Sequence, residues 1–283
     1  MTDQEFVRFL QDVLPHMGLK WAGFRKVRGT VRRRVKRRLR ELTISDLDAY
    51  RDYIDRSPEE WSRLQAMCRI PISRFFRDRK VFRLLGETVL PSRAEAALKA
   101  GRSNIRCLCI GCASGEEPYS INLAWLTSVV RRYAALKLDI LAVDAEETML
   151  ERARAGCYNE SSLKEVPQEI RETAFEQADS EFRLRAAYRN GVRFELCDVR
   201  ENMPSEPFDI VFCRNLAFTY FSDIVQRGFL EQIDDRLRPG GYLVIGGHER
   251  LPCEGTRYRP PLPSVPIYQN VKRLEAGASA PAD

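Results

Sequence analysis

The sequence predicts an α/β protein with a mostly parallel, doubly wound sheet behind a small all-helical domain. Three observations predict this class. Helical apolar spacing dominates the chain up to residue 72. From about residue 104, short apolar runs alternate with helical segments, as in parallel sheets with crossover helices. A polar stretch breaks this alternation and indicates an inserted subdomain. The expected parts are a helical, Arg-rich domain at 1–72, the sheet domain at 73–274 with an insertion at 157–191, and a disordered tail at 275–283.

Composition restricts the compartment. The chain has 283 residues and a formal net charge of +6. Its eight Cys lie mostly inside apolar runs, as buried thiols do in a reducing cytosol. We see no apolar run long enough for a membrane span and no signal-peptide pattern at the N-terminus. We therefore expect a cytoplasmic protein that is not embedded in a membrane.

The helical domain carries a local basic feature. Between Arg25 and Arg40 there are ten Lys or Arg and no acid, which points to an acidic partner surface. A merely solvated face is the alternative. A narrow apolar stripe runs along this helix at Val31, Val35, Leu39 and Leu42. Further helices are expected from the spacing of Phe6, Phe9, Leu10, Val13 and Leu14, from a cap at Ser45–Asp48, and from a capping box at Ser57–Glu60.

The second domain alternates strands and helices. Expected strands are 105–110, 138–143, 192–196, 208–213 and 242–245, the last after a turn at Pro239-Gly240-Gly241. Expected helices are 117–132, 146–155 and 222–237.

The most informative stretch joins the first of these strands to its helix. Gly111, Ala113 and Gly115 fall at alternate positions, where larger side chains would block a ligand from the backbone. Glu116 and Glu117 follow at the helix N-terminus. Carboxylates there suit a cationic ligand better than a pyrophosphate. S-adenosylmethionine, with its sulfonium and amino group, is such a ligand.

Three cysteines in this region allow two interpretations. Cys107, Cys109 and Cys112 have the residue type of metal ligands, but the first two alternate on one strand face and the chain has only two His. We interpret them as core residues and expect no metal.

Polar residues follow the later strands, whose carboxyl ends line the ligand crevice in open α/β sheets. Asp144 ends the second strand, where an acid accepts hydrogen bonds from ribose hydroxyls; a simple helix cap is the alternative. Asp198, with Asn202 four residues later, stands where an adenine amino group is met. The residues expected to face the crevice after the fourth strand are Arg214, Asn215 and Tyr220, although Tyr220 by itself is equally well explained as a core aromatic.

An ordered set of motifs resembles the CheR-type chemotaxis receptor methyltransferases, from about residue 18 to 272. The motifs are Ile72-Ser-Arg-Phe-Phe-Arg-Asp78, Gly111-Cys-Ala-Ser-Gly-Glu-Glu-Pro-Tyr-Ser120, Ala142-Val-Asp144, Ala153-Arg-Ala-Gly-Cys-Tyr158, Phe212-Cys-Arg-Asn215 and Pro239-Gly-Gly-Tyr-Leu243.

The resemblance implies a class I methyltransferase fold with a Rossmann-like sheet and an inserted β-subdomain at 157–191 that in some members tethers a receptor tail. It implies S-adenosylmethionine as cofactor, S-adenosylhomocysteine as product, and a chemoreceptor glutamate as acceptor. By motif position, Ser73 and Arg77 would contact the cofactor, Glu116 its amino-acid portion, Asp144 its ribose, and Asn202 and Met203 its adenine, with Arg214 and Tyr220 at the methyl-transfer centre.

One departure leaves the acceptor open. The family places Tyr four residues beyond the Asn of its Cys-Arg-Asn element, whereas Tyr220 lies five beyond Asn215. A glutamate is already ionised at neutral pH, so the reaction needs alignment and exclusion of water rather than a base. Arg214 is expected to hold the acceptor carboxylate bidentately. A small-molecule acceptor is the alternative to an acidic helical receptor. Nucleic-acid binding by the basic helix is disfavoured, because no aromatic platform accompanies it.

Overall fold

The computed structural model describes residues 1–252 and 258–271, and its chain forms two compact units. The first unit contains Met1–Pro71 and Leu216–Gly228, and the second contains Ile72–Asn215 and the described residues from Phe229 on. The tail expected to be disordered lies outside the described residues. Within the described part of the chain, no helix is both long and apolar enough to cross a membrane.

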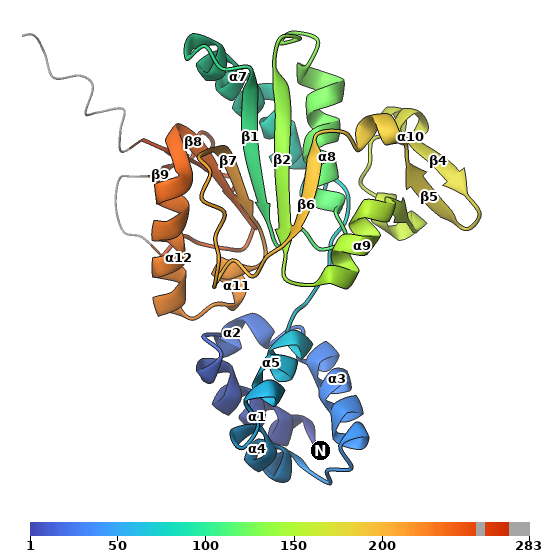
Figure 1. The fold of residues 1–283 in the computed structure, drawn as a ribbon, viewed down its shortest axis with the longest axis vertical. Helices are drawn as coiled ribbons and strands as arrows, with labels where there is room; N and C mark the ends of the chain where they lie inside the picture. Colours follow the sequence, from blue (N-terminus) through green and yellow to red (C-terminus); the bar gives the residue numbers. More distant parts are fainter. Residues whose placement is uncertain (253–257, 272–283) are drawn as a thin grey trace, which may run out of the picture. The chain divides into compact units, whose positions relative to one another are not determined.

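The first unit is helical (Figure 1). Thr2 and Glu5 form a capping box on its first helix, and the Asp46 carboxylate accepts from the Ala49 N–H at the start of the fourth. Both are standard N-terminal devices that satisfy unpaired N–H groups. The helices are α1 (Asp3–His16), α2 (Trp21–Phe24), α3 (Arg28–Glu41), α4 (Leu47–Asp55), α5 (Pro58–Met67), α11 (Ala217–Tyr220) and the first residues of α12 (Asp223–Arg236).

The expected capping box at Ser57 is wrong, although α5 begins where it predicts. Ser57 makes no side-chain cap, because Glu60 turns into the core and is 2% exposed. Arg38 donates to both Glu60 carboxylate oxygens at 2.9 and 2.8 Å, and the Tyr50 hydroxyl donates at 2.8 Å. Burial by itself would raise the pKa of Glu60, but these hydrogen bonds hold it below its usual value. These hydrogen bonds join α3, α4 and α5.

The second unit is built on a seven-stranded sheet in the order β6-β2-β1-β7-β8-β10-β9. Neighbouring strands from β6 through β8 pair in parallel, and β10 runs antiparallel to β8 and β9. The strands are β1 (Asn104–Ile110), β2 (Lys137–Asp144), β6 (Val192–Leu196), β7 (Phe208–Cys213), β8 (Leu237–Ile245), β9 (Tyr258–Arg259) and β10 (Ile267–Asn270).

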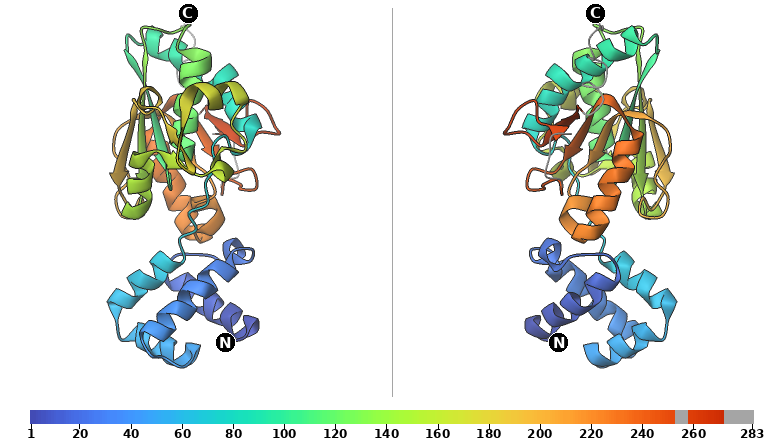
Figure 2. Two further views of the ribbon diagram at one scale, coloured as in Figure 1. Left: turned by 90° about the vertical axis from the view of Figure 1, so that its right-hand side faces the viewer. Right: turned by 90° about the vertical axis from the view of Figure 1, so that its left-hand side faces the viewer.

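Helices lie against the sheet (Figure 2), and the buried side chains between helices and sheet form the core of this unit. Cys107 and Cys109 of β1 and the following Cys112 are at most 1% exposed, which confirms them as core residues. Burial raises the pKa of all three thiols. The helices are α6 (Arg79–Leu84), the π-helix η1 (Leu85–Val89), α7 (Leu90–Lys99), α8 (Glu116–Ala124), the π-helix η2 (Trp125–Val129), α9 (Glu147–Ala155) and the later part of α12.

Two expected boundaries differ from the structure. The helix expected to reach residue 132 ends as η2 at Val129. The strand expected from Tyr242 begins at Leu237, and the Pro-Gly-Gly turn forms an irregularity within β8, because Phe208 pairs with Leu237 but Ile210 pairs with Tyr242.

The polar insertion folds as a small antiparallel sheet in the order β3-β5-β4, drawn at the right in Figure 1. Its elements are β3 (Cys157–Tyr158), the 3-10 helix η3 (Glu160–Leu163), α10 (Gln168–Ala174), β4 (Phe175–Ala178), β5 (Glu181–Leu184) and the 3-10 helix η4 (Ala186–Tyr188). Phe75 packs edge-on against Phe175 and Tyr158, which attaches this subdomain to the segment before α6.

Candidate functional site

The site lies at the topological switch point of the sheet. β1 pairs with β2 on one side and β7 on the other, and Ile110 is level with both Val143 and Cys213. The chain leaves β1 toward β2 and β6, and it leaves β7 toward β8. Crossover connections in opposite directions open a crevice at the carboxyl ends of such strands, where ligands bind in open α/β sheets.

The connection 111–115 is fixed by its backbone. Gly111, Ala113 and Gly115 all have positive φ, at 71°, 46° and 89°. The Asp144 carboxylate accepts from the Ala113 N–H at 2.9 Å and from the Glu146 N–H at 3.0 Å, so Asp144 caps its own turn and also fixes this connection. A Cβ at Gly115 would lie 2.8 Å from the Ala153 Cβ, so packing against α9 by itself already requires glycine there.

Glu116 is a buried carboxylate without a salt bridge to any described residue, although the charge of Arg152 acts on it. Its side chain accepts from the Ser114 hydroxyl at 2.9 and 3.1 Å and from Ser162 at 3.5 Å, and Ser73 also donates to it. Burial is the largest effect and raises the pKa of Glu116 against these hydrogen bonds. Among the described residues, none makes a salt bridge to it. A buried carboxylate that has hydrogen bonds but no salt bridge fits a cationic ligand group.

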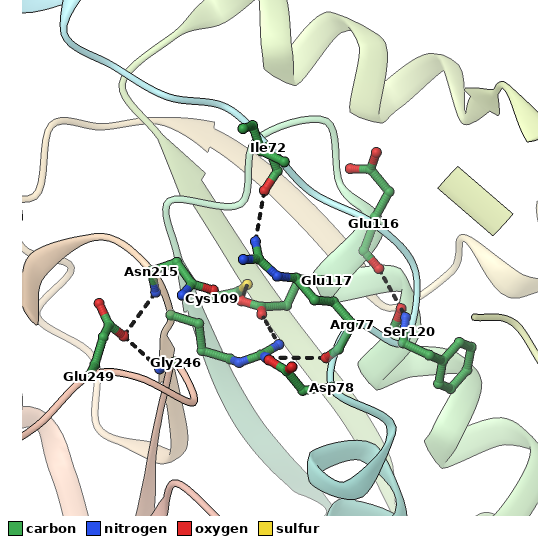
Figure 3. A network of polar contacts seen from close by, with 12 residues as sticks. Ile72, Arg77, Asp78, Cys109, Glu116, Glu117, Ser120, Asn215, Gly246 and Glu249 are labelled. Atoms are coloured by element: carbon green, nitrogen blue, oxygen red, sulfur yellow. Dashed lines mark hydrogen bonds and ion pairs between the residues drawn. The ribbon is translucent and has the colours of Figure 1, made fainter. Parts of the chain in front are cut away.

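Glu117, the next residue, is neutralised within the protein. It accepts from Arg214 Nη1 at 2.8 Å, and Arg214 Nη2 binds Asp78 and the Arg77 carbonyl (Figure 3). The side chain of Arg214 is 2% exposed, and its Nε has no hydrogen-bond partner in the described structure. The expected bidentate grip of Arg214 on an acceptor does not fit this arrangement, because both of its terminal nitrogens already bind carboxylates of this chain.

The segment before α6 crosses the site in a strained conformation. Phe76 and Asp78 have φ of 52° and 66°, in the left-handed region that side chains rarely adopt. The Ser120 hydroxyl accepts from the Phe76 N–H at 2.9 Å, and the Arg77 guanidinium donates to the Ile72 carbonyl at 3.1 Å (Figure 3). These bonds hold the strained backbone against α8.

Asn215 is fixed by a residue far along the chain. The Glu249 carboxylate accepts from the N–H groups of Asn215 at 2.9 Å and Gly246 at 2.6 Å. A Cβ at Gly246 would lie 2.5 Å from Asn215 Nδ2 and 2.8 Å from a Glu249 carboxylate oxygen, so a larger residue there would displace these side chains. The connections after β7 and β8 are therefore locked together.

The expected adenine residues lie in the connection after β6. The Cys197 N–H donates to the Asp144 carbonyl at 2.9 Å, which brings this connection beside the end of β2. Asp198 is held by the guanidinium of Arg200 at 2.6 and 3.0 Å. Met203 is buried and Asn202 is exposed.

Tyr220 belongs to the first unit, in α11. Its ring lies 5.0 Å from the ring of Phe24, and its carbonyl accepts from the Lys20 N–H at 2.8 Å. Of the expected residues, those brought together in the second unit are Ser73, Arg77, Gly111, Ala113, Gly115, Glu116, Asp144, Asp198, Asn202, Met203, Arg214 and Asn215.

The sequence analysis missed three site residues: Asp78, Glu117 as the partner of Arg214, and Glu249. Asp78 and Glu117 stand inside the quoted motifs, so the available signal was their acidity, which could have been matched to the positive charge of Arg214. Glu249 gave no such signal, because its partners are backbone N–H groups.

The strand order with its antiparallel β10, and the turn with positive φ at the switch point, define an α/β protein of the class I methyltransferase fold. The model of the CheR methyltransferase, SAM binding domain, matches residues 72–263, and that of the CheR methyltransferase, all-alpha domain, matches residues 24–66. The chain belongs to the CheR methyltransferase family.

Curated relatives are similar over most of the chain. A chemotaxis protein methyltransferase of Listeria monocytogenes is 34% identical over 64% of this chain and 66% of its own length. One of Borreliella burgdorferi is 26% identical over 89% of both. An uncharacterized 104.1 kDa protein of Rhodobacter capsulatus is 32% identical over 79% of this chain, which spans only 23% of that relative.

Among solved structures, the N-methyltransferase NodS of Bradyrhizobium japonicum, in complex with S-adenosyl-L-homocysteine, is 15% identical with a TM-score of 0.31. The match covers 58% of this chain and 64% of the NodS chain. At that score the likeness assigns no residue.

Proposed function

We propose that this protein is an S-adenosylmethionine-dependent methyltransferase that esterifies glutamate side chains of an acidic, helical, chemoreceptor-like protein. The single observation that supports this cofactor is that two adjacent glutamates have different partners. Glu117 is neutralised by a salt bridge to Arg214, whereas the buried Glu116 forms no salt bridge with a described residue, and the charge of Arg152 does not outweigh its burial. A cationic amino-acid group beside Glu116 would supply the missing charge.

The residues at the switch point fit this ligand. Glu116, with Ser73 donating to it, would bind the ammonium, and Asp144, which already accepts from two backbone N–H groups at the end of β2, would also accept from the ribose hydroxyls. Asp198, Asn202 and Met203 would surround the adenine, and Gly111 and Asn215 would line the crevice between them. When bound, the cofactor supplies an electrophilic methyl group.

The chain's own part in the reaction is alignment and desolvation. The acceptor carboxylate is ionised at neutral pH and needs no base. Arg214 acts as a positioning residue that fixes Glu117 and Asp78, and Arg77 lies on the same strained segment. Tyr220 is proposed to orient the acceptor. Both charges diminish as the methyl group transfers, so removing their hydration beforehand raises the energy of the reactants more than that of the transition state and lowers the barrier.

The basic helix α3 supports an acidic protein acceptor. Its arginines divide into two sets. Arg34 donates to the Met67 carbonyl, Arg38 binds Glu60, and Arg28 and Arg32 pair with Asp3, so these four serve the fold. The remaining residues, spaced i, i+3, i+4, i+7, are exposed and form what we call the outer basic face: Arg33, Lys36, Arg37 and Arg40. The face lies opposite the buried Val31, Val35 and Leu39 and is long enough to follow an acidic helix.

The test is to incubate the protein with methyl-labelled cofactor and a lysate of its host, then separate membranes, soluble protein and metabolites. Base-labile label on membrane protein supports the proposal. Label only in an extractable metabolite would replace the receptor by a small-molecule acceptor. No label transfer, with Glu116→Gln behaving like wild type, would contradict methyl transfer itself.

The outer basic face has its own control. Arg33→Glu with Arg40→Glu should lower the rate on receptor protein at least tenfold. This loss of rate should grow as the salt concentration falls, because exposed charges act within a Debye length of about 8 Å at physiological ionic strength. Arg8→Glu with Arg56→Glu changes the same charge at exposed positions of the same unit and should leave the rate near wild type. Equal losses in both double variants would refute docking by this face.

A further inference from the structure

The edge of the sheet opposite the site carries a cluster of arginines that the proposed function does not use. Arg93 comes from α7, Arg102 from the connection into β1, and Arg238 from the start of β8. They surround Asp209 near the start of β7. We call these four residues the edge arginine cluster.

The single carboxylate of the cluster is already saturated. Asp209 is fully buried, and Arg102 binds it through two nitrogens at 2.8 and 2.9 Å. The Arg106 N–H donates to it at 3.0 Å, while Arg238 Nε stays 3.8 Å away. One negative charge therefore faces three guanidinium groups.

Arg93 is the exceptional member. It is 7% exposed, and among the described residues no carboxylate forms a salt bridge with it. Its hydrogen bonds are long, at 3.3 Å to the Pro239 carbonyl and 3.5 Å to the Ser92 hydroxyl. In the described structure, the Nε atoms of Arg93 and Arg238 are buried without a partner. Burial, with the positive charge of Arg102, lowers the pKa of both residues.

We propose that the edge arginine cluster binds a phosphate group. Guanidinium groups match the geometry of phosphate oxygens, and a dianion would balance the two uncompensated positive charges. The side chains of Arg102 and Arg238 are 22% and 28% exposed, so a ligand can reach them from solvent.

The surroundings also offer room for a body attached to that phosphate. Arg106, whose N–H binds Asp209, lines a cavity of about 330 Å³ at the same edge, together with Arg193, Phe208 and the carboxylates of Asp139 and Glu206, the latter paired with Arg106. The phosphate can thus come from the free ion or from a small phosphate ester, and the two sources differ in whether they occupy this cavity.

The test titrates the full chain with inorganic phosphate and, separately, with ribose 5-phosphate, against sodium chloride of equal ionic strength. Calorimetry and thermal unfolding are the readouts, so no methyl transfer is required. We expect saturable binding that Arg238→Gln weakens at least tenfold. Arg132→Gln, on an arginine whose side chain is 71% exposed, is the matched control and should bind as wild type does.

Tighter binding of ribose 5-phosphate than of phosphate identifies an ester as the ligand, and equal binding identifies the free ion. Without phosphate, Arg238→Gln should be at least as stable as wild type, because it removes one of three like charges. The proposal is overturned if neither probe binds saturably, or if Arg238→Gln binds as tightly as wild type.

Discussion

Replacing Glu117 by Gln tests whether the Arg214 network is a buried charge balance. The substitution keeps an oxygen that can accept from Arg214 but removes the negative charge. Glu117 and Arg214 have side chains 13% and 2% exposed, so solvent screens their attraction weakly. The partially exposed Asp78 remains as the only described carboxylate on Arg214.

The magnitude follows from the geometry. Two unit charges about 4 Å apart attract by about 4 kcal/mol at an effective dielectric constant of about 20. Relief of the burial cost of the Glu117 carboxylate offsets part of this loss. We expect Glu117→Gln to lower the free energy of unfolding by about 2 kcal/mol, since breaking a buried charged hydrogen bond costs about 1.5–3 kcal/mol.

Urea unfolding followed by circular dichroism measures this change. The matched control is Glu195→Gln, which removes the same charge from a pair 2.9 Å apart whose side chains are 50% and 63% exposed. Exposed pairs contribute less than about 1 kcal/mol, so this variant should stay near wild type. Equal effects in the two variants would refute the charge-balance reasoning.

Three further changes test the account. Affinity for S-adenosylmethionine should fall as pH drops toward the raised pKa of Glu116, because the protonated carboxyl no longer attracts a cation. Titrations at stepped pH should show that Glu116→Gln flattens this dependence. Without ligand, the raised pKa of Glu116 means that the contribution of this residue to the stability of the fold is lost as pH rises. Gly115→Ala should destabilise by more than about 1 kcal/mol through its positive φ and its close contact, whereas Gly29→Ala in α3, with open space around it, should stabilise by up to about 1 kcal/mol, as thermal melts can compare. Tyr50→Phe should cost about 1–3 kcal/mol and make unfolding more acid-sensitive, because Glu60 loses a donor that lowers its pKa and its stabilisation disappears as pH falls through that value.

Local pattern was sufficient for most of the fold. Apolar runs located β1, β2, β6 and β7, and the polar insertion was recognised because it lacked their period. The predicted ends of helices and strands were wrong where tertiary structure determines them. The bulge at Pro239 depends on pairing with β7, and η2 ends a helix whose apolar pattern continues.

The site was predictable only one residue at a time. Successive strand ends identified Asp144 and Arg214, because parallel strands bring their carboxyl ends to one edge. The partners of Arg214 come from the segment before α6 and from α8, both far from Arg214 in sequence, so no spacing could pair them. Equally, the sequence could not distinguish Glu116 from Glu117, since only burial and partners separate them.

The most direct test of the central claim is a calorimetric comparison of S-adenosylhomocysteine with methylthioadenosine, which lacks the amino-acid group. If Glu116 receives the ligand's ammonium, wild type should bind the former at least tenfold more tightly, about 1.4 kcal/mol, and Glu116→Gln should reduce that preference. Equal affinities in wild type, or an undiminished preference in Glu116→Gln, would contradict the account.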